Sequence, residues 1–226
     1  MVSQILEFLK ELEHNNNREW FQNNKERYNV LREAHVDIVR QLINRIALFD
    51  GEVAGVDVKD CLFRIYRDIR FSPNKQPYKT HFGAYIAARG GRNSERSGYY
   101  LHLEPDNCLL SGGIWMPQPK LLRKLRQDIY THIDEFVAIL ENPDFKALYP
   151  TLEGEVLRRI PFGFPIDFKY GKILRHKDFC VAANKPDSFF LQEDWIAQAA
   201  SCYETLLPFT RFLNYSVDEY LGADFL

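Results

Sequence analysis

The patterns that would assign this chain to a secreted, membrane-bound or zinc-binding class are missing. The four cysteines lie far apart with no C-x-x-C pair, which argues against a disulfide framework and against a zinc site. No stretch approaches the roughly 18 apolar residues that span a bilayer, and the N-terminus lacks the pattern of a signal peptide. We expect a soluble, cytoplasmic protein with reduced thiols, no membrane partner, no metal ion and no cofactor.

Several enzyme signatures are also missing. The sequence contains no G-x-S-x-G elbow, no H-E-x-x-H helix and no calcium-binding loop. Gly112 and Gly113 precede a predicted helix, but their spacing matches neither a P-loop nor a dinucleotide fingerprint, so we interpret them as a tight turn. Whether the chain is an enzyme stays open, and the sequence indicates no oligomeric state.

Charge is balanced over the whole chain. A net charge of -2, with 27% charged and 46% hydrophobic residues, argues against intrinsic disorder and against a surface that attracts nucleic acid everywhere. Any anion site must therefore be a local patch. A length of 226 residues favours one domain spanning 1–226, with a C-terminal helical lobe from about residue 119 as an alternative.

Hydrophobic periodicity predicts an α+β fold. Apolar residues at helical spacing predict a first helix over Ser3–Glu13, and a capping box formed by Asn16 and Glu19 predicts the start of a long second helix reaching Ile46. Further helices are predicted from Pro119 to before Pro143 and over about 193–214. An antiparallel sheet of about four to five strands is expected between them. The candidate strands are Cys61–Ile69, Phe82–Ala88, Tyr99–Glu104, Cys108–Gly112 and, as a fifth, Lys177–Ala183.

The segment from Phe63 to Phe82 concentrates positive charge. It holds five cations against the single acid Asp68, a local charge of +4. Strand alternation places Arg64 and Arg70 on one face, while two Pro-containing turns place the later cations where the chain returns to the sheet. We predict that these side chains converge to bind a small anion. The predicted ligand-binding residues are Arg64, Arg67, Asp68, Arg70, Lys75 and Lys79.

Two other interpretations of this segment remain open. In the first, Asp68 and acids elsewhere pair with the arginines in a network that only fixes the fold. In the second, the cations and nearby tyrosines form a nucleic-acid binding module without catalysis. A phosphorylated or nucleotide-like ligand is the first hypothesis, because charge-assisted hydrogen bonds suit phosphate and carboxylate groups.

Acid/base chemistry has three candidates beside these cations. His102 and Glu104 alternate with apolar residues and share one face of a predicted strand, so the carboxylate can orient the imidazole. His81 lies where the basic segment returns to the sheet. The alternative for all three is a solvated sheet face.

Four motifs carry a family resemblance. They are NNNREWF at 15–21, FRIYRDIRFSPNKQPYKTHF at 63–82, GYYLHLEP at 98–105 and GGIWMP at 112–117. Together they resemble a bacterial and fungal family catalogued only as a domain of unknown function, over about Ile5 to Val181. The resemblance implies a shared fold and carries no activity or catalytic residues.

Overall fold

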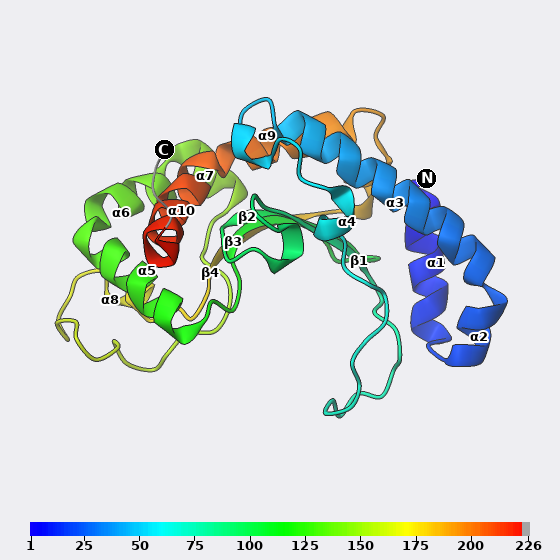
Figure 1. Ribbon diagram of the computed structural model, residues 1–226, viewed down its shortest axis with the longest axis horizontal. Helices are drawn as coiled ribbons and strands as arrows, with labels where there is room; N and C mark the ends of the chain where they lie inside the picture. The colour runs from blue at the N-terminus through cyan, green and yellow to red at the C-terminus, as the bar shows by residue number, and fades with distance from the viewer. Residues whose placement is uncertain (223–226) are drawn as a thin grey trace.

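A four-stranded antiparallel sheet lies at the centre of the computed structural model, which describes residues 1–222 (Figure 1). The strands are β1 (Phe82–Ile86), β2 (Gly98–Leu103), β3 (Cys108–Ile114) and β4 (Phe179–Lys185), in the order β1-β2-β3-β4. Helices precede and follow the sheet, so the predicted α+β class is confirmed. The predicted fifth strand is present as β4.

Three helices form the N-terminal part: α1 (Val2–His14), α2 (Arg18–Asn23) and α3 (Lys25–Ile46). The predicted long helix is interrupted at Asn24, whose backbone leaves the helical conformation (φ -106°). Beyond it, α3 buries the stripe expected from the sequence, including Leu31, Ile38 and Leu42. Periodicity thus predicted the buried face correctly but missed the break.

The cap of α2 is not the predicted Asn16. The Asn17 side chain accepts a hydrogen bond from the Trp20 amide (2.9 Å) and caps the helix. Asn16 instead pairs with the backbone of Tyr78 through its side-chain amide. The predicted capping box is wrong because both asparagines are able to cap a helix. Only the tertiary structure shows that Asn16 is engaged with Tyr78, which leaves Asn17 as the cap.

One face of the sheet is covered by α3, α9 (Trp195–Thr205) and α10 (Leu207–Leu221), as Figure 1 shows. The strand side chains on this face are fully buried, for example Ala84, Leu101, Leu110 and Val181. They belong to a hydrophobic cluster that also includes residues of α1 and α5. The opposite face carries the alternate residues of β1, β2 and β3, and these are half-buried or lie at glycines.

The segment 62–81, which we call the basic arm, contains no named strand. The predicted strand Cys61–Ile69 is wrong: α4 (Val58–Cys61) ends where it was expected to begin. Two stretches of the basic arm run alongside each other, held by the Tyr66–Tyr78 bridge and a hydrogen bond from Lys79 N–H to the Ile65 carbonyl (2.8 Å). Prolines lack the N–H that a regular ladder needs, and the basic arm projects from the body as an irregular hairpin (Figure 1).

The remaining helices pack mainly on α10 or on one another. They are α5 (Pro119–Thr131), α6 (Ile133–Glu141), α7 (Pro143–Leu148) and α8 (Gly171–Leu174), with short 3-10 turns at Gly51–Val53, Gly91–Asn93 and Asp187–Leu191. As predicted, α6 ends before Pro143. Single bridges join Leu62 to β1 and Leu152 to β4. Among residues 1–222, no helix is both long enough and apolar enough to cross a membrane.

Candidate functional site

A pocket of about 700 Å³ opens on the face of the sheet that the long helices leave uncovered. Side chains of β1, β2 and β3 form its floor. The base of the basic arm and the turn after β3 form its sides, and the exposed Trp115 and Met116 lie on that turn. The lining residues include Phe63, Lys79, His81, Tyr85, Tyr100, His102, Leu109 and Ser111. A pocket of this size and mixed polarity is typical of small-molecule sites.

Gly83 makes room for this arrangement. A Cβ atom at this position would lie 2.9 Å from the Tyr100 hydroxyl oxygen, closer than such atoms normally approach. The glycine on β1 therefore lets the neighbouring tyrosine of β2 place its hydroxyl over the floor of the pocket.

A chain of hydrogen bonds runs along β2. The Tyr100 hydroxyl lies 2.8 Å from Nδ1 of His102, and Nε2 of His102 lies 3.2 Å from Oε2 of Glu104. The predicted contact between His102 and Glu104 is therefore present. In the simplest protonation pattern of these three residues, the His102 Nε2–H donates to the Glu104 carboxylate and Nδ1 accepts from the Tyr100 hydroxyl.

Two further side chains hold the Glu104 carboxylate in place. Thr80 donates to Oε1 (2.5 Å) and Asn107 donates to Oε2 (2.6 Å). Burial alone would raise the pKa of Glu104, but the hydrogen bonds from Thr80, Asn107 and His102 together lower it. The carboxylate is thus held ionised and fixed in orientation.

His81 stacks on His102 with ring centroids 4.3 Å apart. Burial, with a smaller contribution from neighbouring His102, lowers the pKa of His81 to about 4. The imidazole is therefore neutral at neutral pH, with the lone pair of one ring nitrogen available to a ligand. The structure thus brings together His81, His102 and Glu104, the three acid/base candidates of the sequence, from the residue before β1, from β2 and from the residue after β2.

Lys79 is a half-buried cation at the base of the basic arm. Its ammonium lies 5.1 Å from the centre of the Phe63 ring, and burial, followed by the nearby positive charge of Arg64, lowers its pKa. Within residues 1–222, its Nζ forms no hydrogen bond or ion pair in the structure. An unpaired, partly desolvated cation at a pocket wall is suited to an anion supplied from outside.

The other predicted ligand-binding residues lie along the basic arm and do not line the pocket. Arg70 donates to both carboxylate oxygens of Asp68 (3.0 and 2.7 Å), which lowers the pKa of Asp68, so the predicted ion pair is present. Lys75 donates to the Ile69 carbonyl and Arg67 to the Gln76 carbonyl. Arg64 is exposed near Lys79.

Sequence reasoning placed Tyr100 on the strand face of His102 and Glu104 without giving it a role in the site, and it missed Thr80 and Asn107. The alternation that places His102 and Glu104 on one face also places Tyr100 there, so a signal for it was present. Asn107 follows Glu104 by one turn of the chain, which is a weak local signal. Thr80 gave none, because its contact with Glu104 depends on how the basic arm meets β2.

Comparison with family models identifies the family of the chain. The chain matched no curated protein and no solved structure. A family model described as "Conserved hypothetical protein (DUF2461)" matches residues 4–212, extending past the range of the motif resemblance at the C-terminal end. With most of its length covered by that model, the chain belongs to the DUF2461 family of conserved hypothetical proteins.

Proposed function

We propose that the pocket binds a small anionic ligand, such as a phosphorylated or nucleotide-like metabolite, through Lys79. The observation that carries this proposal is the half-buried position of Lys79, whose Nζ forms no hydrogen bond or ion pair with the residues that the structure describes. Arg64 adds a second positive charge nearby, and the neutral ring of His81 supplies a hydrogen-bonding group beside it. The proposal narrows the predicted binding set, because three of the five cations are engaged within the basic arm.

The remainder of the pocket supports a ligand with an apolar or aromatic portion. Leu109, Trp115 and Met116 line it, while the hydroxyls of Tyr100 and Ser111 offer directional polar contacts. An anionic group at Lys79 and a flat or apolar group against these residues would use both halves of the pocket. The cytoplasmic location is kept in this proposal, since the four free, buried cysteines suit a reducing compartment.

The basic arm itself supports a second candidate function, nucleic-acid binding. Phe71 is 94% exposed on it, with the Arg70 guanidinium beside its ring. A projecting hairpin with cations and an exposed aromatic ring fits the backbone and base-stacking contacts that single strands use. Against it, Asp68 already neutralises Arg70. The contacts of Arg67 and Lys75 agree equally with the network that only fixes the fold.

The test of the first proposal is a thermal-shift screen of phosphorylated metabolites, nucleotides and short oligonucleotides, followed by calorimetric titration of the best small ligand. Lys79→Gln should weaken its binding by about 1.5 to 3 kcal/mol, the range of a charge-assisted hydrogen bond. Lys75→Gln is the matched control, because it removes the same charge from the same arm away from the pocket. Equal affinities of the wild type and Lys79→Gln would refute the pocket site.

The same variants test the second candidate. If the basic arm binds oligonucleotides, Lys75→Gln and Phe71→Ala should both weaken binding measured by fluorescence anisotropy. The lysine variant should also reduce the salt dependence, since removing a cation that neutralises one phosphate lowers the slope by about one unit. Oligonucleotide binding that survives both changes would rule out the arm as the contact surface.

A further inference from the structure

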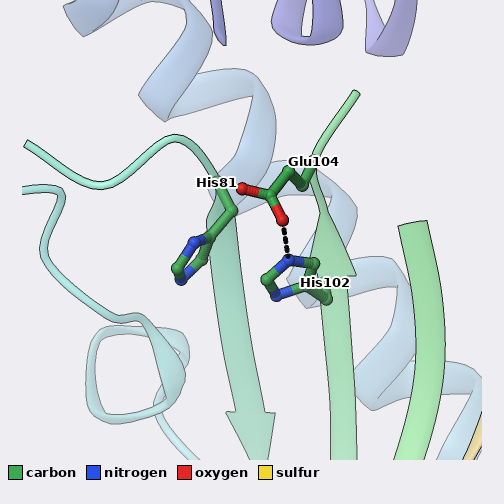
Figure 2. A group of neighbouring side chains, drawn as sticks. All are labelled: His81, His102 and Glu104. Carbon is green, nitrogen blue, oxygen red and sulfur yellow. Dashed lines mark hydrogen bonds and ion pairs between the residues drawn. The ribbon is translucent and has the colours of Figure 1, made fainter. Parts of the chain in front are cut away.

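Three groups able to bind a metal ion meet beside the pocket, and two of them line it. One donor atom each from His81, His102 and Glu104 lies within 4.8 Å of the others. The side chains come from the residue preceding β1 and from the end of β2, and Figure 2 shows the carboxylate above two facing imidazole rings. Two imidazoles and one carboxylate form a donor set typical of zinc and non-haem iron sites.

The spacing between His102 and Glu104 already suits a shared ion. Atoms bound to one metal at about 2.1 Å lie about 3.0 to 3.4 Å apart in octahedral or tetrahedral geometry. The 3.2 Å between Nε2 and Oε2 falls in that range. The donor atom of His81 lies within 4.8 Å of these two, so its side chain would have to move closer to share the ion.

The groups behind these donors have the arrangement found around bound metals. The Tyr100 hydroxyl contacts Nδ1 of His102, the ring nitrogen that faces away from the carboxylate. When Nε2 binds an ion, Nδ1 carries the proton and the hydroxyl oxygen can accept a hydrogen bond from it. Thr80 and Asn107 fix the Glu104 carboxylate. Such supporting contacts set the tautomer of the imidazole and the direction of the carboxylate.

We propose that His81, His102 and Glu104 bind a divalent transition-metal ion, of the Zn²⁺ or Fe²⁺ class, with its remaining coordination positions open to the pocket. His81 and His102 both line the pocket, so water or a ligand can reach the ion. Two neutral imidazoles and one carboxylate leave a divalent site with one net positive charge. That charge would add to the charge of Lys79 and favour an anion beside both.

The metal site does not depend on the anion proposal, and the two are separable. Lys79→Gln should lower the affinity for the anionic ligand while changing the Zn²⁺ affinity little. Glu104→Gln should strongly weaken Zn²⁺ binding. Failure of one kind of binding without the other would show which proposal is wrong.

The experiment uses the full-length protein, stripped of metal with a chelator and titrated with Zn²⁺ alone in a calorimeter. We expect one ion per chain, and we expect His81→Gln and Glu104→Gln, which each remove a ligand, to weaken binding by at least about 100-fold, more than loss of a supporting contact costs. Tyr100→Phe should weaken it by about 10-fold, because the variant lacks the hydroxyl that supports His102. His14→Gln, an exposed histidine on α1, is the control and should bind as the wild type does.

A second readout covers the case in which a variant does not fold. Zn²⁺ added to the wild type should shift the imidazole NMR signals of His81 and His102 among the six histidines, and Co²⁺ should give the visible absorption of a site with nitrogen and oxygen ligands. The proposal is overturned if Zn²⁺, Co²⁺ and Fe²⁺ all fail to bind. It is equally overturned if binding is unaffected by Glu104→Gln and His81→Gln.

Discussion

Asn16 and Tyr78, 62 positions apart in the sequence, are joined by a pair of hydrogen bonds. The Asn16 side chain donates to the Tyr78 carbonyl (3.0 Å) and accepts from the Tyr78 amide (3.1 Å), as a neighbouring strand would. Next to this contact the Tyr78 ring stacks on Phe21, with centroids 4.0 Å apart. The turn between α1 and α2 thereby holds the basic arm against the body.

Asn16→Ala should therefore loosen the basic arm. The change leaves two backbone groups of Tyr78 without partners, at a cost of about 1 to 3 kcal/mol in the free energy of unfolding. Amide hydrogen exchange over 62–81 should accelerate. Asn17→Ala is the comparison: it removes the cap of α2 at about 1 kcal/mol and should leave exchange in the basic arm unchanged. Similar exchange in both variants would mean that Asn16 does not anchor it.

Gly83→Ala tests how tightly β1 and β2 pack at the pocket floor. The new Cβ would meet the Tyr100 hydroxyl at 2.9 Å and force the ring away from His102. We expect a loss of about 1 to 3 kcal/mol in urea unfolding, the usual cost of overpacking. Gly51→Ala introduces a Cβ with nothing within 4 Å and serves as the control. A Gly83→Ala protein as stable as the wild type would contradict the packing described.

Asp218→Asn should destabilise the protein strongly. Asp218 lies in α10 and pairs with Arg96, whose side chain is 2% exposed. Removing Asp218 leaves the Arg96 guanidinium with only a half-exposed carboxylate to compensate its charge, and breaking a buried pair costs about 3 to 5 kcal/mol. Glu52 contacts the same arginine from a site that is 52% exposed, so Glu52→Gln should cost well under half as much. Chemical denaturation of both variants gives the comparison, and equal losses would mean that burial does not set the strength of this network.

Acid should destabilise the protein partly through His35. Burial on α3 lowers the pKa of His35 to about 4 in the folded state, below the ordinary value of 6.5. As pH falls from about 6.5 to about 4, the unfolded chain binds a proton that the folded chain refuses, so stability is lost over that window by about 3 kcal/mol. Above about pH 6.5, His35 is neutral in both the folded and the unfolded state, so the stability that acid removes is fully present.

His35→Leu should remove this part of the pH dependence. The difference in unfolding free energy between variant and wild type should change across the window and stay constant above pH 7. His14→Gln, at an exposed position, provides the reference curve. Parallel curves for His35→Leu and the wild type from pH 7 to pH 4 would show that His35 titrates normally in the folded protein.

The sequence predicted regular elements better than the basic arm. The stripe on α3 and the alternation in β1 to β4 follow from burial of one face, a rule that acts locally. Phe63, Ile65, Ile69 and Phe71 showed the same alternation, yet only Ile65 is fully buried and Phe71 is almost fully exposed. The basic arm pairs with itself around Tyr66 and Tyr78 and projects away from the sheet, so this alternation had no sheet face to follow.

The candidate site was predictable where one strand supplies it. His102 and Glu104 share a face of β2, so their contact followed from spacing alone. The convergence of five cations required a strand geometry that the basic arm does not have, and the position of Lys79 depends on the long-range contact of Tyr78 with Asn16. Contacts set by tertiary packing are not encoded in residue spacing.

The two single bridges at the borders of the sheet have a consequence for how the protein meets other chains. Leu62 and Leu152 each occupy part of the free hydrogen-bonding edge, of β1 and of β4 respectively. An incoming strand from a second molecule would have to displace them before it could extend the sheet. Release of the basic arm would therefore expose the edge of β1, to which the strand of a second molecule could pair.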